Sequence, residues 1–248
     1  MKRFVLLAAL AACSVPATAL EGKDCTTKGE CADGYVCDTH TNRCFLSNGD
    51  GGIVDSRLTT SCLGTAPGME IDRYNGDFTG WIDTDGTWMG GPEIKQTSAQ
   101  VQNSYVFRSS AQLTSTKDYR VTATMRIVQN GSGSPSYGIV LRAQLSSQDK
   151  SRYACIWIPK GKELRLEGTN GGNTTTLGSA LVSTTMQDVP LTMEAQVIGS
   201  TLSCCIREFA PSAKLTGIMN PDVTSGLPGL QTTRMQAAFG SFAVTQQP

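Results

Sequence analysis

The sequence predicts an all-β protein, a two-sheet antiparallel jelly-roll sandwich with a small disulfide-rich N-terminal module. Three observations support this fold class. Short segments alternate apolar and polar side chains, runs rich in Gly and Asn separate these segments, and the chain contains nine cysteines. No long stretch shows the period of an amphipathic helix. Many short strands over roughly 180 residues favour a sandwich over a parallel α/β fold.

Residues 1–19 have the features of an export signal. Basic residues at Lys2 and Arg3 precede an apolar stretch that is too short to span a bilayer. The run Leu-Ala-Ala-Cys that ends at Cys13 resembles the lipobox of bacterial lipoproteins. The last three residues of the leader, Ala-Thr-Ala, instead fit a peptidase that cleaves after small side chains. The leader therefore spans residues 1–19, or 1–12 if the protein is a lipoprotein.

Both processing routes predict an exported protein. Acylation of Cys13 would make it an outer-membrane lipoprotein, because several acyl chains suffice for stable attachment. Cleavage at the second site would instead give a periplasmic or extracellular protein. The formal net charge is zero, and no basic run follows the first residues. The sequence therefore disfavours a nucleic-acid partner and predicts membrane attachment only through the N-terminal lipid anchor.

The first predicted folded unit, residues 24–45, contains four closely spaced cysteines. So short a segment cannot bury enough apolar surface to offset its chain entropy, so disulfides are needed to stabilise it. Export favours disulfides over zinc coordination, and four cysteines allow three pairings. The four are Cys25, Cys31, Cys37 and Cys44. The only histidine, His40, also lies in this unit. The predicted sandwich therefore has no histidine to act as the base of a nucleophilic triad.

The run from Cys31 to Cys37, Cys-Ala-Asp-Gly-Tyr-Val-Cys, resembles cysteine-rich modules of the Dickkopf and EGF-like type. This resemblance implies an interlaced pairing, in which Cys25 bonds to Cys37 and Cys31 bonds to Cys44.

A linker rich in Gly, Asp, Asn and Ser is expected at 46–56, and the sandwich at 57–248. Alternation is clearest at 119–127 and 191–197, where apolar side chains alternate with Thr, Arg, Glu and Gln. Further strands are expected at 104–108, 137–145, 152–158, 163–168, 174–177, 202–207, 229–232 and 237–245.

The remaining four cysteines lie in the predicted sandwich. Alternation directs Cys204 toward the core and Cys205 to the opposite face, so the two neighbours are expected to form separate bridges. Their partners are Cys62 and Cys155. The sequence leaves open which partner bonds to which neighbour.

Five short motifs follow one another along the sandwich: Asp77-Phe-Thr-Gly-Trp81, Asp118-Tyr-Arg-Val-Thr-Ala123, Tyr137-Gly-Ile-Val-Leu-Arg142, Gly199-Ser-Thr-Leu202 and Gly226-Leu-Pro-Gly-Leu230. As an ordered set they resemble the concanavalin A-like lectin/glucanase superfamily, particularly its laminin-G-like and 3-keto-disaccharide-hydrolase-like bacterial members. The resemblance covers about 71–245. It implies a jelly roll whose concave sheet holds carbohydrate, in some members with a calcium ion nearby.

Candidate sugar-binding residues are aromatic side chains for stacking and an arginine for fixing hydroxyl groups. The resemblance places the arginine on the sugar-binding sheet. A core or structural role is the alternative for each of them. The set is Trp88, Tyr137, Tyr153, Trp157 and Arg142.

Asp77, Asp83 and Asp85 supply hard oxygen ligands, so calcium is the one cofactor that the sequence suggests. They lie in two short stretches, 75–77 and 83–86, and neither stretch completes a calcium-binding loop. The segment Glu70-Ile-Asp72 superficially matches the Glu-x-Asp core of β-glucanases in the superfamily, but Asn75 stands where the next carboxylate is required. No catalytic residue is therefore assigned.

Together these features predict an exported, non-catalytic surface module that binds a glycan or an envelope protein. Two alternatives stay open: a carbohydrate-active hydrolase of the 3-keto-disaccharide type, and a purely structural envelope lipoprotein.

Overall fold

A computed structural model of the chain describes residues 26, 31, 35–38, 43–47, 53–54, 61–64, 68–145, 151–183, 190–220 and 222–248. The leader at 1–19, Cys13, Cys25 and His40 lie outside these residues, as does the side chain of Cys44. The chain divides into two compact units, residues 1–59 and 60–248. In the described ranges, no helix has both the length and the apolar character that crossing a membrane requires.

The first unit contains a small three-stranded sheet of β1 (Tyr35–Asp38), β2 (Arg43–Ser47) and β3 (Ile53–Val54). Cys37 on β1 stands opposite Cys44 on β2, and Cys31 and Cys37 are each disulfide-bonded. The linker predicted at 46–56 overlaps this sheet. It begins inside β2 and includes β3, whose Val54 pairs with Leu46. The β-branched pair that forms β3 has the side chains that strands prefer.

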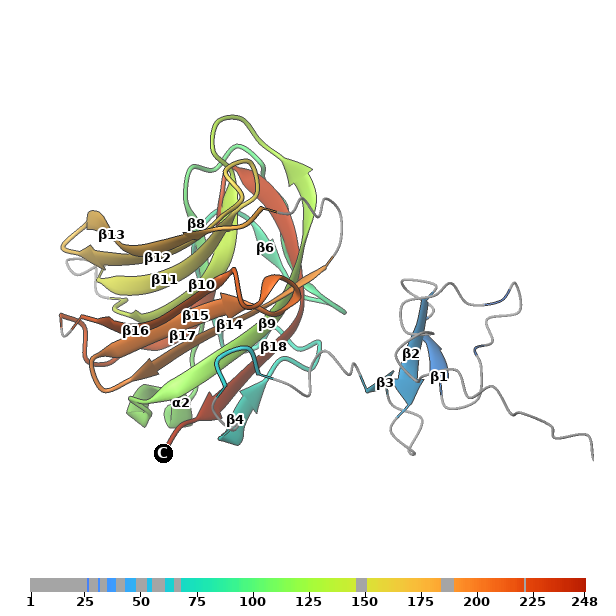
Figure 1. Ribbon diagram of the computed structural model, residues 1–248, viewed down its shortest axis with the longest axis horizontal. Helices are drawn as coiled ribbons and strands as arrows, with labels where there is room; N and C mark the ends of the chain where they lie inside the picture. Colours follow the sequence, from blue (N-terminus) through green and yellow to red (C-terminus); the bar gives the residue numbers. More distant parts are fainter. Residues whose placement is uncertain are drawn as a thin grey trace, which may run out of the picture. The chain divides into compact units, whose positions relative to one another are not determined.

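The second unit is the predicted all-β sandwich, with two antiparallel sheets facing each other (Figure 1). The seven-stranded sheet is built from β5 (Trp81–Asp85), β8 (Ser104–Arg108), β10 (Ser136–Ala143), β11 (Arg152–Ile158), β12 (Glu163–Asn170), β13 (Asn173–Leu181) and β17 (Leu227–Thr233). Its spatial order is β13-β12-β11-β10-β17-β8-β5. Neighbours in this order are far apart in sequence at β10-β17-β8, as a jelly roll requires.

The eight-stranded sheet contains β4 (Met69–Arg73), β6 (Trp88–Met89), β7 (Ile94–Gln96), β9 (Tyr119–Asn130), β14 (Leu191–Ile198), β15 (Thr201–Ile206), β16 (Lys214–Met219) and β18 (Met235–Gln246). Its order is β16-β15-β14-β9-β18-β7-β6, and β4 also pairs with β18. A short helix, α2 (Ala111–Ser115), and a 3₁₀ turn, η2 (Arg207–Phe209), complete the unit.

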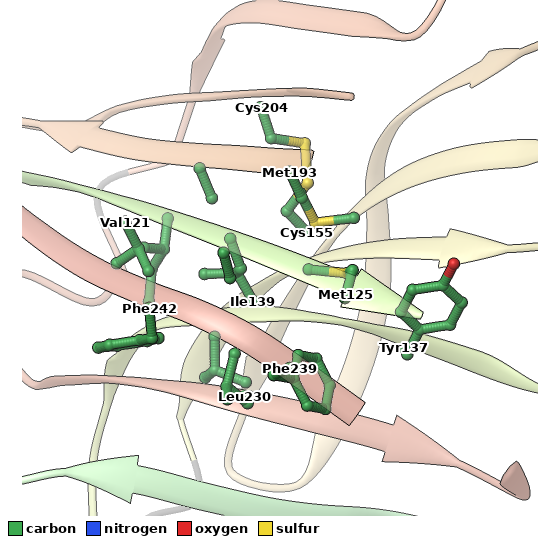
Figure 2. Packing of buried hydrophobic residues seen from close by; sticks show 14 of the residues in the cluster. Val121, Met125, Tyr137, Ile139, Cys155, Met193, Cys204, Leu230, Phe239 and Phe242 are labelled. Carbon is green, nitrogen blue, oxygen red and sulfur yellow. A yellow bond between two sulfur atoms is a disulfide. The ribbon is translucent and has the colours of Figure 1, made fainter. Parts of the chain in front are cut away.

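The core lies between the two sheets, and Figure 2 shows part of it. On β14, Met193 is fully buried in the core, whereas the neighbouring Glu194 lies on the other face of the strand and outside the core cluster. This is the period-two arrangement that the sequence predicts. Inside the core, Cys155 of β11 is bonded to Cys204 of β15, so a disulfide joins the sheets.

A second disulfide, Cys62–Cys205, holds residues 61–64 against the outer face of the eight-stranded sheet. We call residues 61–64 the strap. Next to this disulfide, Ser61 donates to the fully buried Glu194 at 2.6 Å, and Arg207 Nε donates to the same carboxylate at 2.5 Å. The pairing that the sequence left open is thus Cys62 with Cys205 and Cys155 with Cys204.

Candidate functional site

The four aromatic residues predicted to stack on sugar lie in the core. Tyr137 and Tyr153 are each 1% exposed, Trp157 is 3% exposed and Trp88 is 6% exposed. Tyr153, Cys155 and Trp157 occupy the inward positions of β11. Cys155 marks this face as inward, because its disulfide to Cys204 crosses the core. The four aromatic rings therefore pack between the sheets and do not lie on the outer face of the seven-stranded sheet.

Arg142 is also a structural residue rather than a sugar ligand. It is 2% exposed, and its positive φ of 50° accompanies a register shift between β10 and β17 that turns its side chain toward the end of the sandwich. The guanidinium donates to the carbonyl oxygens of Lys117 at 2.9 Å, Gly199 at 2.7 Å and Val223 at 3.0 Å. Arg142 thus joins three loops, and its donors are occupied.

The carboxylates predicted to hold calcium do not converge. Asp77 caps the backbone N–H of Thr79 at 2.9 Å. In the described part of the chain, one group of three acidic, cysteine or histidine side chains places its ligand atoms within 4.8 Å of one another, and it contains none of Asp77, Asp83 and Asp85. That group is Glu194 with Cys62 and Cys205, whose sulfurs are already bonded to each other.

The Glu70-Ile-Asp72 segment forms part of β4 in the eight-stranded sheet. Glu70 pairs with Arg73 at 2.5 Å, and Asp72 pairs with Arg108 at 2.8 Å. Both carboxylates are therefore held in ion pairs, which is ordinary for polar residues on a strand.

The structure offers a different site, on the outer face of the seven-stranded sheet. A groove of about 600 Å³ runs over the outward side chains of β8, β17, β10, β11 and β12. We call it the outer groove. This volume is in the range of about 300–1,000 Å³ that is typical of ligand sites. Five residues in register cross it from strand to strand: Arg165, Ile156, Gly138, Gln231 and Tyr105.

The floor of the outer groove is apolar and partly bare. Ala154, Ile156 and Ile158 of β11 form a small cluster separate from the core. Gly138, between Ile156 and Gln231, contributes no side chain. A Cβ at Gly138 would lie 2.0 Å from the carbonyl oxygen of Cys155. Close strand packing therefore excludes a side chain at this position.

One wall of the outer groove is an ion-pair triad on β12. Arg165 Nη2 donates to Glu163 at 2.7 Å, and Arg165 Nη1 donates to Glu167 at 3.4 Å. The three side chains remain 18–30% exposed, so they are accessible to a ligand. The hydrogen bond from Arg165 lowers the pKa of Glu163 below its ordinary value. Both the arginine and the glutamate therefore stay charged near neutral pH.

The other wall is Tyr105 of β8, which pairs with Arg152 reaching across from β11. The guanidinium carbon of Arg152 lies 4.3 Å from the centre of the Tyr105 ring, and Nη2 donates to the phenol oxygen at 2.5 Å. Burial raises the pKa of Tyr105, so its hydroxyl stays protonated. Between the walls, Gln231 supplies an amide and is 5% exposed.

Sequence reasoning missed this site. The segment 163–168 was correctly expected to be a strand. Its charged residues alternate with Leu164 and Leu166. This alternation is a signal from which the outward positions of Glu163, Arg165 and Glu167 could have been predicted. The neighbouring β11 gave no such signal, because apolar residues occupy both of its faces.

No family model matches the sequence, and no curated protein is detectably similar to it. Solved structures do share its fold. A carbohydrate-binding module, CBM66 from Bacillus subtilis, superposes with a TM-score of 0.56 and 15% sequence identity, covering 68% of this chain and 96% of that one. The sandwich therefore shares the jelly-roll fold of that module. A Bacillus subtilis protein of unknown function with a galectin-like fold agrees, with a TM-score of 0.53, 12% identity and coverage of 73% of this chain and 97% of that one.

The two-sheet sandwich restricts what the site can be, because one face of each sheet packs in the core and the other faces outward. On the eight-stranded sheet, the strap and the disulfide Cys62–Cys205 cover part of the outer face. On the seven-stranded sheet, the outer face carries the outer groove. Its paired charges, amide and apolar floor suit a ligand that offers both hydroxyl groups and C–H surface.

Proposed function

We propose that the sandwich is a non-catalytic glycan-binding module and that the sugar lies in the outer groove. The observation that carries this proposal is the row Arg165–Ile156–Gly138–Gln231–Tyr105, which places hydrogen-bonding groups on both sides of apolar Ile156 and Gly138. A sugar ring has the matching surface, with hydroxyl groups at its edge and C–H bonds on its faces. The likeness to a Bacillus subtilis carbohydrate-binding module supports the same function.

The chemistry of the triad favours binding over hydrolysis. A glycosidase needs one carboxylic acid whose pKa is raised so that it can donate a proton to the leaving group. Glu163 has its pKa lowered by Arg165, and Glu167 accepts from the same guanidinium. Neither carboxylate has the environment of a general acid, so both are assigned to hydrogen bonding with hydroxyl groups.

The test is binding of the full-length, oxidised chain to an immobilised panel of bacterial and plant polysaccharides. Arg165→Ala is expected to weaken binding at least about tenfold, because hydrogen bonds to charged groups contribute about 1.5–3 kcal/mol. Gln231→Ala is expected to weaken it less. The matched control is Arg73→Ala, which breaks an arginine–glutamate pair on β4 in the other sheet. Binding by Arg165→Ala at the wild-type level, or no binding to any polysaccharide, would overturn the proposal.

We also propose that the protein is exported and anchored to a membrane face by acylation of Cys13. The basic start and the Leu-Ala-Ala-Cys run support this location, in which a glycan module would face envelope or extracellular polysaccharide. Mass spectrometry of the mature N-terminus tests it. A diacylglyceryl-modified Cys13 is expected. An unmodified chain that begins at Leu20 would rule out the anchor and leave export in place, and a chain that retains Met1 would rule out both.

A further inference from the structure

A second cavity, of about 390 Å³, lies on the inward side of the seven-stranded sheet, at one end of the sandwich. The hairpin between β12 and β13 borders it through Asn170 and Asn173. The connection from β16 to β17, which crosses from one sheet to the other, borders it through Asn220 and Asp222. We call this cavity the end pocket. Its volume is in the range that is typical of ligand sites.

The end pocket lies where the inward side chains of the seven-stranded sheet change from apolar to polar. On β12 the inward series passes from Leu166, which is fully buried in the core, to Gly168 and then Asn170. Gly168 pairs with Thr175 of β13 on one side and with Tyr153 of β11 on the other. Because Gly168 contributes no side chain, a hollow with polar walls replaces the apolar packing at this end of the sandwich.

The end pocket is separate from the outer groove. Gly168 and Asn170 alternate along β12 with the charged triad of the outer groove, so the two sets face opposite sides of the sheet. The two sites also differ in charge. Asp222 is the only charged residue among the described residues that line the end pocket, whereas the outer groove includes Arg152 and Lys160 as well as the triad. The two sites are therefore expected to accept different ligands.

The lining of the end pocket has polar atoms that the protein itself does not use. The side chains of Asn173 and Asp222 make no hydrogen bond or ion pair to any described residue. Asn170 and Asn220 use only their side-chain oxygens, which accept from Ser151 at 3.3 Å and from Tyr153 at 3.0 Å. Three side-chain amides and one carboxylate can therefore hydrogen-bond to a ligand.

Tyr153 fixes the loop that carries Asn220 and Asp222. Its hydroxyl donates to the carbonyl oxygen of Asn220 at 3.0 Å and accepts from the backbone N–H of Val223 at 2.8 Å. Burial raises the pKa of Tyr153, so the hydroxyl keeps its proton and both hydrogen bonds near neutral pH. The loop is thus held in place before a ligand arrives, which lowers the entropy cost of binding.

We propose that the end pocket is a second ligand site, independent of the outer groove, and that it binds a single uncharged sugar unit. Each amide offers a donor and an acceptor to a hydroxyl group, and the Asp222 carboxylate accepts from hydroxyl groups. Because no cation lies among the described residues of the lining, Asp222 would repel a ligand that carries a carboxylate, sulfate or phosphate. The volume of the end pocket is smaller than that of the outer groove, which suits one sugar unit rather than a chain.

The experiment titrates the full-length, oxidised, isotope-labelled chain with monosaccharides and follows its amide resonances by NMR. The probes are glucose, galactose, mannose, fructose, N-acetylglucosamine and glucuronic acid. At least one uncharged sugar is expected to shift the resonances of 170–173 and 220–223 in a saturable way, and glucuronic acid is expected to leave them unchanged.

Variants of the end pocket test the assignment of the site. Asn173→Ala is expected to weaken the binding of that sugar by about two- to tenfold, as the loss of a neutral hydrogen bond would. Asp222→Ala is expected to weaken it by about tenfold or more, because hydrogen bonds to charged groups are stronger. The matched control is Asn130→Ala, at the exposed end of β9 in the other sheet, which should bind as the wild type does.

The outcomes separate this proposal from that of the outer groove. Arg165→Ala, on the opposite face of the sheet, is expected to leave monosaccharide binding unchanged. The end pocket is overturned if Arg165→Ala abolishes this binding, if both end-pocket variants bind as the wild type does, or if no uncharged sugar in the panel binds. Each of these results leaves polysaccharide binding by the outer groove to its own test. Asn173 and Asp222 are exposed, so their variants are expected to keep the wild-type fold in the same NMR spectra.

Discussion

The guanidinium of Arg152 covers the ring of Tyr105, at 4.3 Å from its centre, and donates to its hydroxyl at 2.5 Å. Tyr105 is the one aromatic residue among the described side chains that line the outer groove. Because Arg152 occupies a face of the ring, recognition at this wall depends on hydrogen bonding rather than on stacking a sugar against the tyrosine. The pair acts as a single polar unit.

Substitutions at Tyr105 are expected to separate its two contributions. Tyr105→Phe keeps the ring under Arg152 and removes only the acceptor, so glycan affinity should fall by less than about fivefold. Tyr105→Ala removes the support of Arg152 and should reduce affinity by about tenfold or more. Isothermal titration with the best-binding oligosaccharide measures both. Equal losses in the two variants would show that the ring has no part in positioning Arg152.

The binding of glycan should be nearly independent of pH between about 5 and 9. Glu163 has an ordinary pKa of 4.5 that Arg165 lowers in the folded protein. The contribution of this ion pair is therefore complete above pH 4.5 and is lost as the pH falls through the lower folded-state pKa. Burial raises the pKa of Tyr105 above its ordinary value of 10, so its hydroxyl stays protonated across this pH range. A titration of affinity against pH that shows a step near pH 6 to 7 would contradict this account.

Arg142→Ala should destabilise the sandwich without a direct effect on glycan binding. The substitution removes the donor from the carbonyl oxygens of Lys117, Gly199 and Val223, of which only the bond to Val223 is fully buried. An unsatisfied buried group costs about 1–3 kcal/mol, so we expect a loss of about 1–3 kcal/mol in the free energy of unfolding. Denaturant titration followed by fluorescence measures it, with Arg73→Ala as a surface control. A stable variant that no longer binds glycan would restore Arg142 to the site.

The double variant Cys62→Ala/Cys205→Ala should lower stability and spare glycan affinity. The bridge spans 143 residues of sequence, and removal of a native disulfide typically costs about 2–5 kcal/mol. The strap lies over the eight-stranded sheet, whereas the outer groove lies on the other one. Chemical denaturation and glycan titration of the oxidised variant check both parts. A loss of affinity in a variant that is still folded would mean that the strap supports the groove through the core.

The sequence was sufficient to predict most of the long strands. The strands expected at 104–108 and 152–158 coincide with β8 and β11, and the alternation at 119–127 and 191–197 marks β9 and β14. It did not reveal β6 or β7, which are two and three residues long. Such short strands carry no periodic pattern of their own, and pairing with β18 and with each other defines them.

The candidate site was harder to predict, because the type of a residue does not show which way its side chain points. Tyr153 and Trp157 share a face with Cys155, and Cys155 bonds to Cys204, which alternation already directs inward. That chain of reasoning would have placed both rings in the core. The groove row could not be assembled in the same way. It joins Arg165 to Tyr105 through three intervening strands, and their order depends on the jelly-roll topology.

The two disulfides of the sandwich meet at neighbouring residues of β15. Cys205 holds the strap through Cys62, and Cys204 holds β11 through Cys155. A pull on the chain ahead of Cys62 thus reaches β11, the strand that provides the floor of the outer groove, through covalent bonds alone. If the chain is tethered at its N-terminus and drawn by flowing liquid or a captured polysaccharide, the load bypasses the hydrogen-bonded ladders. The ligand site and the tether then stay connected even where the sheets are strained.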